Sequence, residues 1–269
     1  MEIIILPDAD HIGRLAAAVI ADEVRRKPTA VLGLATGSSP LGIYRQLAQW
    51  VEEGSLDLSH TSAFALDEYV GIAADRPPSY AAVIHREVVA PLRLDPDRVQ
   101  VPDGHARDLE GACVAYEEAI RAAGGVDIQI LGIGGNGHIG FNEPTSSFTS
   151  RTRVKTLAPE TRADNARFFE QDEQVPIHCV TQGLGTIMDA RRLVLVAQGA
   201  GKADAVAAAV EGPLSSRCPA SLLQLHQHAI VIADEAAASR LELSDYYRYA
   251  YANKPDWQRA HGPDGTERT

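Results

Sequence analysis

A histidine and a glutamate stand close together in the glycine-rich stretch GIGGNGHIGFNEP, which covers residues 132–144. An imidazole oriented by a carboxylate can transfer protons, so His138 and Glu143 are candidates for acid–base chemistry. Gly132, Gly134 and Gly137 also satisfy G-x-G-x-x-G, the pattern of dinucleotide-binding loops. The stretch therefore allows two interpretations, a nucleotide site or flexible backbone that lets a ligand approach the histidine.

The residues that follow the motif argue against a dinucleotide. That fingerprint needs a helix opening at its third glycine and an acidic residue about 20 residues later, at the end of the next strand. Here Gly137 leads into HIGFNEP, a poor helix start, and residues 151–158 contain no acid. A lone histidine is more often structural, but one in a glycine-rich loop with Asn136 and Glu143 nearby favours a functional role.

Two further acids, Asp67 and Glu68, follow the apolar run at residues 63–66. A carboxylate held partly out of water has a raised pKa and can move protons. The structural alternative is that these acids cap the next segment or pair with a surface arginine. The sequence leaves both interpretations open.

An anion site is predicted in ATGSSPLGIY, residues 35–44, where small and hydroxyl residues join a strand to a helix. With Ser39 as the helix cap and Pro40 as the first helical residue, free amides and the positive helix end would attract a phosphate. A plain capped turn is the alternative. An anion would also explain Lys202 at a helix start, where a cation is otherwise unfavourable. Arg167 is a further candidate, although an arginine on a helix is usually a solvated surface residue.

The elements that must position these residues alternate between strand and helix. This alternation predicts a single-domain α/β fold, a Rossmann-like three-layer arrangement with a mostly parallel sheet and helices on both faces. Ligands gather at the carboxyl ends of such strands, so we expect the candidates to meet there. The domain is expected over residues 1–254, and residues 255–269 as a polar, disordered tail. Strands are expected at 3–6, 31–34, 63–66, 126–133, 153–157, 193–197 and 229–233, and helices at 11–25, 41–51, 80–89, 109–123, 162–170, 202–210 and 235–249.

Composition limits the function classes. The chain has 269 residues, 45% of them apolar, and a net charge of −11, which disfavours nucleic-acid and anionic-membrane partners without excluding a local anion site. The three cysteines, Cys113, Cys179 and Cys218, lie far apart and suggest reduced thiols. The start of the sequence shows no export or membrane-spanning pattern, so a cytoplasmic location is expected. No spacing typical of a metal site occurs, and we expect neither a metal nor another cofactor.

Five segments together resemble the isomerising glucosamine-6-phosphate deaminases: LGLATGSSP, FALDEYVG, LGIGGNGHIGFNEP, SRTRVKTL and AAVEGP. The similarity runs from residue 3 to about residue 249, and DEYVG with GHIGFNEP is its most specific part. The related 6-phosphogluconolactonases have a GHTAS-type loop and lack both FNEP and DEY. The resemblance implies conversion of D-glucosamine 6-phosphate and water into D-fructose 6-phosphate and ammonia, within N-acetylglucosamine catabolism.

The resemblance also implies roles for the candidate residues. Asp67 matches the base that moves a proton from C2 to C1, and His138 matches the acid that opens the sugar ring. Glu143 matches the carboxylate that orients and charges this histidine. Asn136 stands where some members carry aspartate, and an amide there is expected only to position His138. The residues that match the phosphate cradle are Thr36, Gly37, Ser38, Ser39, Arg167 and Lys202.

Some members of the family are hexamers activated by N-acetylglucosamine 6-phosphate at a second phosphate site between subunits. The residues that match this allosteric site are Ser146, Arg153, Lys155, Thr156 and Tyr249. The stretch SSRCPAS at 215–221 is more similar to the unregulated branch. A homo-oligomer with this second site is therefore an open expectation.

Three other functions stay open at this point. Galactosamine-6-phosphate deamination differs by the configuration of one hydroxyl, and lactone hydrolysis belongs to another reaction class. A sugar-phosphate sensor of a transcription regulator is the alternative outside the enzymes. The net charge disfavours DNA, and a sensor would have little use for a proton relay.

Overall fold

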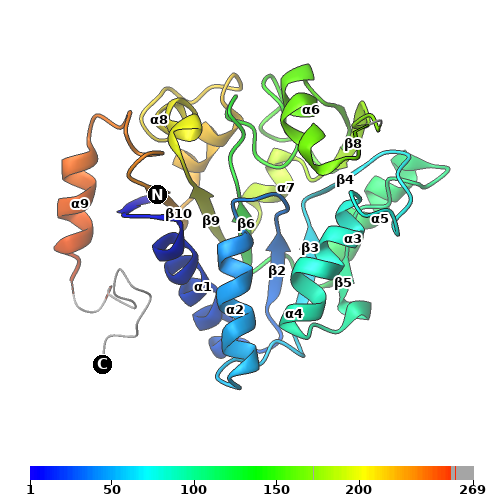
Figure 1. The fold of residues 1–269 in the computed structure, drawn as a ribbon, viewed down its shortest axis with the longest axis horizontal. Coiled ribbons are helices and arrows are strands. Elements are labelled where there is room, and N and C mark those ends of the chain that lie inside the picture. The colour runs from blue at the N-terminus through cyan, green and yellow to red at the C-terminus, as the bar shows by residue number, and fades with distance from the viewer. Residues whose placement is uncertain (172, 256–257, 259–269) are drawn as a thin grey trace.

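The chain forms a large parallel sheet between two layers of helices, as the computed structural model shows for residues 1–171, 173–255 and 258 (Figure 1). The single-domain α/β prediction is confirmed. All neighbouring strands of this sheet are parallel. In spatial order the strands are β1 (Glu2–Leu6), β10 (Ala229–Asp234), β9 (Arg192–Ala197), β6 (Ile128–Leu131), β2 (Val31–Leu34), β3 (Ser62–Ala65) and β5 (Val99–Gln100).

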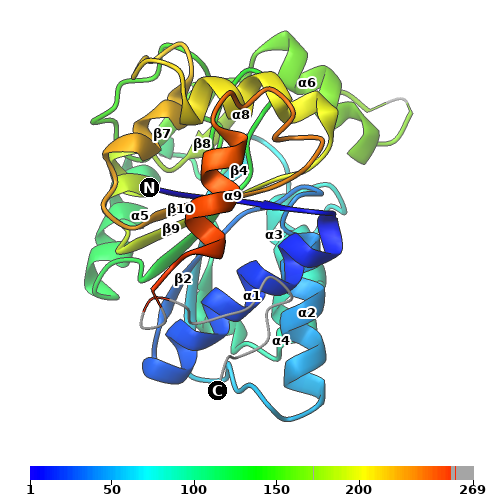
Figure 2. The same cartoon turned by 90° about the vertical axis from the view of Figure 1, so that its left-hand side faces the viewer.

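Helices cover both faces of the sheet, with α1 (Ala9–Arg26) and α2 (Leu41–Glu52) on one face and α5 (Leu109–Ala122) on the other (Figure 2). Helix α1 begins where the Asp8 carboxylate accepts a hydrogen bond from the His11 amide. The first two helices approach closely because glycines meet between them. A Cβ atom on Gly13 would lie 2.8 Å from the carbonyl carbon of Gly42.

A second, antiparallel sheet of three strands stands above the carboxyl ends of the large one. Its order is β4 (Asp67–Tyr69), β8 (His178–Thr181) and β7 (Arg153–Thr156). The predicted strand at 153–157 therefore exists, but it belongs to this small sheet. Strands β4 and β8 were not predicted. A separate apolar cluster, which includes Tyr69, Phe141 and Cys179, packs against the small sheet.

Four of the remaining helices follow predicted ones with shifted bounds: α3 (Tyr80–Ile84), α6 (Pro159–Asn165), α8 (Ala203–Val210) and α9 (Ser244–Ala252). Helices α4 (Ala90–Leu92) and α7 (Leu184–Met188) were not predicted, and a π-helical turn lies at His85–Val89. Short 3₁₀ turns lie at Pro96–Arg98, Ala166–Phe168, Ala200–Lys202 and Pro219–Leu225. The expected helix at 235–249 is wrong in its first half, because residues 235–240 form turns and α9 begins only at Ser244. The predicted tail lies outside the described residues, apart from Pro255 and Gln258.

The strand order places a crevice between β2 and β6. The chain leaves β2 toward β3 and β5 on one side, and then returns to β6 on the other side of β2. At such a reversal the loops after the two strands separate and leave room for a ligand. Gly33 lets the strands pack here, because a Cβ atom at this position would lie 1.9 Å from Oε1 of the buried Gln129.

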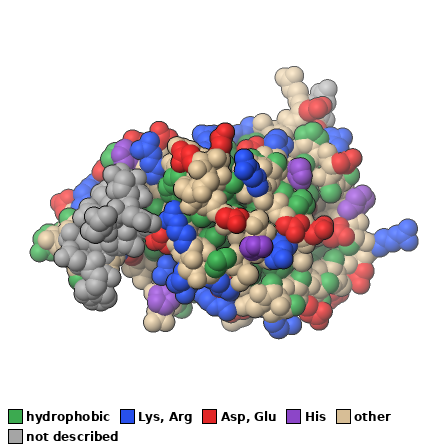
Figure 3. Space-filling model, turned by 90° about the horizontal axis from the view of Figure 1, so that it is seen from below, with side chains coloured by type: hydrophobic (Ala, Val, Ile, Leu, Met, Phe, Trp, Pro, Cys, Tyr) green, Lys and Arg blue, Asp and Glu red, His purple; other side chains and the backbone are tan. Residues whose placement is uncertain are grey.

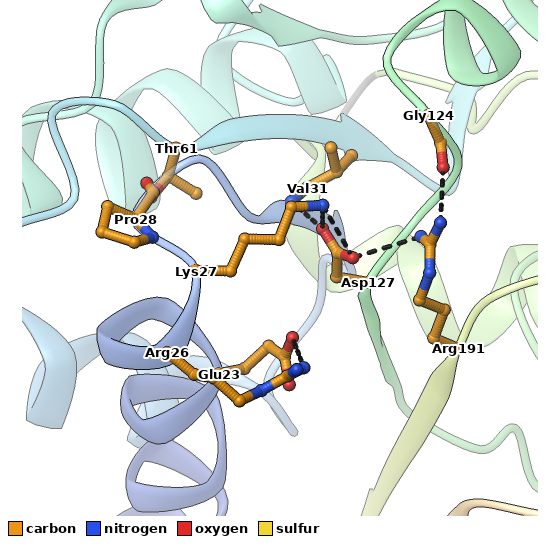
Figure 4. A network of polar contacts seen from close by, with 9 residues as sticks. All are labelled: Glu23, Arg26, Lys27, Pro28, Val31, Thr61, Gly124, Asp127 and Arg191. Atoms are coloured by element: carbon orange, nitrogen blue, oxygen red, sulfur yellow. Dashed lines mark hydrogen bonds and ion pairs between the residues drawn. The ribbon is translucent and has the colours of Figure 1, made fainter.

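At the amino ends of the strands, away from the crevice, a buried carboxylate holds several elements together. This is Asp127, which is 2% exposed (Figure 4). It accepts hydrogen bonds from the Lys27 ammonium at 2.7 Å, the Val31 amide at 2.7 Å and the Arg191 guanidinium at 3.1 Å. These groups join the end of α1 to the starts of β2, β6 and β9. Charges of both signs are interspersed over this face of the molecule (Figure 3). Asp127 is thus a structural residue, far along the strands from the crevice.

None of the helices in the described part of the chain is long and apolar enough to cross a membrane.

Candidate active site

A cleft of about 680 Å³ opens at the carboxyl ends of the parallel strands. It is lined by the loops that follow β2, β3, β6 and β9, together with residues of α3 and α6. The strand ends that the sequence singled out therefore meet in one place. The predicted site residues that line the cleft are Thr36, Gly37, Ser38, Ser39, Asp67, His138, Arg167 and Lys202.

His138 is held from one ring nitrogen by a short polar chain. Its Nδ1 lies 2.7 Å from Oδ1 of Asn136 and 3.6 Å from Oε2 of Glu143. The Asn136 amide donates to the same Glu143 oxygen at 2.8 Å. Asn136 is thus the direct partner of the imidazole, and Glu143 fixes the amide behind it. With an oxygen on Nδ1, the ring carries its proton there, and Nε2 is left for the cleft.

The glycines of the motif serve this histidine. A Cβ atom on Gly134 would lie 2.1 Å from Cε1 of His138, so only a glycine leaves room for the ring. Gly137 has a φ of 84°, a conformation that favours glycine, and its carbonyl accepts the Ala220 amide at 2.9 Å. The loop leads into an isolated β-bridge between Ile139 and Asn142 rather than into a helix. The dinucleotide interpretation therefore lacks the helix that it needs.

The Glu143 carboxylate is kept ionised by its partners. Burial alone would raise the pKa, but contacts with His138, the Thr161 hydroxyl and the Ala158 amide outweigh it and lower the pKa to about 2. The Ala158 amide donates to Oε1 at 3.0 Å. Glu143 therefore keeps its negative charge beside the imidazole at physiological pH.

Asp67 is 5% exposed and lies at the start of β4, at the wall of the cleft. Burial raises its pKa well above the ordinary value, and the neighbouring Glu68 raises it further, while the Phe141 amide opposes the shift. A carboxylate with a raised pKa is a stronger base than a solvated one. Asp67 is thus suited to abstract a proton from carbon.

Glu68 has a different task from its neighbour. Its carboxylate accepts hydrogen bonds from the amides of Tyr69 at 2.8 Å, Tyr80 at 3.0 Å and Ala81 at 2.8 Å. It therefore caps the start of α3, as the structural alternative in the sequence suggested. Of the two adjacent acids, Asp67 alone lines the cleft.

The loop after β2 provides the neutral half of an anion site. Gly37 has a φ of 90°. The side-chain amide of Gln198 donates a hydrogen bond to the Ser39 carbonyl at 3.1 Å, which joins this loop to the one after β9. The expected cap is wrong by one residue, because Pro40 occupies the cap position and α2 begins at Leu41. Ser39 is left with its side chain in the cleft lining.

Two cations face this loop from other elements. Arg167 lies in the 3₁₀ turn after α6, and Lys202 in the turn before α8. Burial and the charge of Arg167 lower the pKa of Lys202, while Asp164 raises it. Two cations that disfavour each other at one wall are arranged for an anion placed between them. Asp164 also lines the cleft and was not predicted.

Hydrogen-bonded side chains line a further part of the cleft, and the sequence analysis did not predict them. The Tyr69 and Tyr80 hydroxyl oxygens lie 3.2 Å apart, and the Asn165 amide donates to Tyr69 at 3.0 Å. Tyr80 also forms a hydrogen bond with the Thr36 side chain. Tyr69 stands in the quoted DEYVG segment, whereas Tyr80 and Asn165 carry no signal that marks them in the sequence.

The residues expected at a second phosphate site are not gathered in one place within this chain. Arg153, Lys155 and Thr156 lie on β7, where the Arg153 guanidinium donates to Oδ1 of Asn142 at 2.8 Å. Ser146 is 2% exposed, and its hydroxyl donates to the Glu143 carbonyl. Tyr249 is 66% exposed on α9, at the other end of the molecule from β8, the neighbour of β7 (Figure 1). A site that combined all of them would need a second subunit.

In residues 1–171, 173–255 and 258, no group of three or more histidine, cysteine, aspartate or glutamate side chains is arranged to hold a metal ion.

Comparisons with known proteins agree with this geometry. A family model described as glucosamine-6-phosphate isomerases/6-phosphogluconolactonase matches residues 8–232. A glucosamine-6-phosphate deaminase of Streptomyces avermitilis is 60% identical, over 96% of this chain and 99% of the relative. A solved structure of a monomeric glucosamine-6-phosphate deaminase is 42% identical, with a TM-score of 0.87 over 89% of this chain and 100% of that one.

The solved 6-phosphogluconolactonase of Trypanosoma brucei has the same fold at a lower level of similarity. It is 18% identical, with a TM-score of 0.69 over 89% of this chain and 98% of the other. At that identity the likeness describes the fold alone. From its family match, its close relatives and its cleft, the chain belongs to the family of glucosamine-6-phosphate isomerases and 6-phosphogluconolactonases.

Proposed function

We propose that this chain is an isomerising deaminase that converts D-glucosamine 6-phosphate and water into D-fructose 6-phosphate and ammonia. The observation that carries the proposal is the placement of Asp67 and His138 in one cleft with Thr36–Ser39, Arg167 and Lys202. A base, an acid and an anion site are the groups that a proton shuffle on a sugar phosphate requires. The deaminases among the relatives support this choice over the lactonase.

Ring opening is the first step. The Asn136 oxygen holds the Nδ1 proton of His138, so Nε2 is free to deliver a second proton to the ring oxygen of the sugar. That second proton exists in the imidazolium form of His138, with the Glu143 carboxylate 3.6 Å from Nδ1. The C1 hydroxyl gives its proton to water as the ring C1–O bond breaks, and an open-chain aldehyde results.

Isomerisation is the task of Asp67. Its carboxylate removes the proton from C2 and returns it to C1. The aldehyde oxygen gains a proton and the nitrogen loses one, so the amino aldehyde becomes a C2 imine with a C1 hydroxyl. The raised pKa of Asp67 makes the carboxylate a better base for this carbon acid. Water then adds to C2 of the imine, and ammonia leaves with the formation of the ketone.

The phosphate anchors the substrate at the other wall. Amides and hydroxyls of Thr36–Ser39 surround it, while Arg167 and Lys202 neutralise its charge. An anchor that does not change during the reaction contributes mainly to binding. We expect the remaining hydroxyls of the sugar to face the Tyr69, Tyr80 and Asn165 side of the cleft.

We also propose the setting of this activity. We place it in the cytoplasm and in amino sugar catabolism, and the acidic net charge disfavours a nucleic-acid or anionic-membrane partner. The chemistry written above uses side chains and water, so no cofactor or metal enters it. The catalytic unit corresponds to residues 1–254. A hexamer with a second site at Ser146, Arg153, Lys155, Thr156 and Tyr249 remains a proposal, and one solved relative is a monomer.

The decisive experiment is a measurement of ammonium and fructose 6-phosphate released from glucosamine 6-phosphate, with EDTA present and no nucleotide added. Galactosamine 6-phosphate and 6-phosphogluconolactone are tested in parallel. Equal amounts of both products from the gluco substrate are expected. Ammonium from the galacto substrate alone would keep the mechanism and change the substrate. Lactone hydrolysis without ammonium would overturn the proposal.

A further inference from the structure

We infer that Asn142 is a positioning residue that holds the base Asp67 and the acid His138 at a fixed separation across the cleft. The inference rests on the proposed function, since it concerns the two groups that act on one substrate. These groups belong to different parts of the fold. Asp67 lies on β4 of the small sheet, and His138 lies in the loop after β6 of the large one. Contacts between the two sheets must therefore fix the distance between Asp67 and His138.

The Asn142 side chain makes that connection from a fully buried position. It is 0% exposed, and its Nδ2 donates to the Ile139 carbonyl at 3.0 Å and to the Gln182 carbonyl at 2.8 Å. Ile139 follows His138 directly, so the first bond holds the histidine loop. Gln182 follows β8, so the second bond holds the small sheet. Oδ1 of Asn142 is in turn fixed by Arg153 of β7.

From Gln182 the connection continues to the base. The Gln182 amide donates to the Leu66 carbonyl at 2.8 Å, and its side chain donates to the Ala65 carbonyl at 3.0 Å. Leu66 is the residue before Asp67. Strand β8 also pairs Thr181 with Asp67 itself. A shift of Asn142 would therefore be transmitted to the backbone of Leu66 and Asp67.

A second bond supports the same junction. The Phe141 amide donates to the Thr181 hydroxyl oxygen at 3.0 Å, next to the paired Asp67. The two bonds attach residues 139–142 to the end of β8. Reacting groups must be placed within fractions of an ångström, and a displacement of about 1 Å can cost a hundredfold in rate. The phosphate loop after β2 takes no part in these bonds, so substrate anchoring does not depend on them.

The donor pattern makes a sharp substitution available. In Asn142→Asp the size and the acceptor for Arg153 are kept, but an oxygen replaces the amide group and faces two carbonyl oxygens. In Asn142→Ala both carbonyls lose their donor. For each variant we expect kcat on glucosamine 6-phosphate to fall about a hundredfold while KM stays within about threefold of the wild type.

The matched control is Asp127→Asn, which weakens a buried polar network at the amino ends of the parallel strands, away from the cleft. It should lower the melting temperature and leave kcat unchanged. If the Asn142 variants keep kcat within about threefold of the wild type, or lose activity only in proportion to their unfolded fraction, the inference is wrong.

A second pair of variants decides the case if the Asn142 variants do not fold. Thr181→Val removes the acceptor for Phe141, and Thr181→Ser restores it. We expect Thr181→Val to lose kcat at constant KM and Thr181→Ser to recover most of it; equal kcat values would overturn the inference. Wild-type protein is assayed first. Absence of ammonium release there would refute the proposed function itself, whereas active wild type with active variants refutes only the role of Asn142.

Discussion

The imidazole of His138 occupies the space above Gly134 where any other residue would place its side chain. A Cβ atom at this position would lie 2.1 Å from Cε1 of the ring. The glycine-rich loop thus resembles a nucleotide fingerprint in its letters, while its glycines provide space for a histidine. Gly134 is therefore the first residue to substitute.

Gly134→Ala should displace His138 and lower kcat by about a hundredfold, since the acid would no longer reach the ring oxygen. Gly135→Ala is the matched control, because a Cβ atom there has no neighbour within 4 Å among the described residues. Steady-state kinetics of both variants, with thermal melts, check the prediction. Equal losses in both would show that the space above Gly134 does not matter.

Asp67→Asn should abolish turnover while the protein still binds fructose 6-phosphate. It should also raise the melting temperature at neutral pH, because a buried carboxylate with a raised pKa destabilises the fold once it is ionised. Between the ordinary value and the raised one, the native state binds more protons than the unfolded state, so stability falls as pH rises. Each kcal/mol relieved corresponds to about 2–4 °C. Calorimetry and a binding titration test both parts.

The pH profile of the wild type reports on the same group. The base acts only when ionised, so kcat/KM should fall as the pH drops through the raised pKa of Asp67, at higher pH than for a solvated aspartate. Glu68→Gln is the control. It should lower stability by weakening the cap of α3, and move the acid limb only part of the way to lower pH, because burial, the larger cause of the raised pKa of Asp67, is kept. An acid limb near pH 4 would contradict the burial of Asp67.

Glu143→Gln should lower both kcat and stability, and the loss of stability should depend on pH. Its pKa of about 2 lies below the ordinary value, so its stabilising effect is complete above about pH 5 and is lost as the pH falls toward 2. The difference in melting temperature between wild type and variant should therefore shrink between pH 5 and pH 3. A constant difference would mean that the charge contributes nothing to stability.

Asn136 separates orientation from proton relay. Asn136→Ala removes the partner of Nδ1 and should reduce kcat, whereas Asn136→Asp keeps an acceptor at the same place and should retain most activity. If Asn136→Ala is as active as the wild type, then Glu143 at 3.6 Å orients the ring without help.

Lys202→Ala should raise KM by about tenfold or more at nearly constant kcat, since a charge-assisted contact to the phosphate is lost. Asp164→Asn should do the reverse and lower KM by about twofold to fivefold, because it removes a carboxylate that interacts with Lys202 at the wall of the cleft. Initial-rate kinetics at low ionic strength show both effects most clearly. Unchanged KM values would place the phosphate elsewhere in the cleft.

The sequence was sufficient to predict the parallel sheet and the loops that carry the chemistry. Apolar runs such as Val31–Leu34 and Leu193–Ala197 reappear as strands, because buried strands of a parallel sheet leave a strong local pattern. The loops that follow them then meet for topological reasons.

The small antiparallel sheet could not be predicted in the same way. Strand β4 has three residues, and it exists because β8, more than a hundred residues later, pairs with it. The residue pattern of a short segment does not show which distant strand will pair with it. For the same reason the separate tasks of Asp67 and Glu68 were left open, and Asn142 was not recognised. The role inferred for Asn142 depends on its hydrogen bonds to the carbonyl groups of Ile139 and Gln182, and Gln182 lies 40 residues away in the sequence.

The neighbouring positions of β1 and β10 have a consequence for synthesis of the protein. Strand β1 leaves the ribosome before the other strands of the large sheet, yet its Glu2 pairs with Ile230 of β10. The first strand must therefore wait, unpaired, while almost all other elements emerge. The nascent chain can assemble β2, β3, β6 and β9 around the cleft beforehand, and β10 then inserts between β9 and β1 to complete the sheet. Closure of the catalytic fold is in this sense a late, single event that depends on β10.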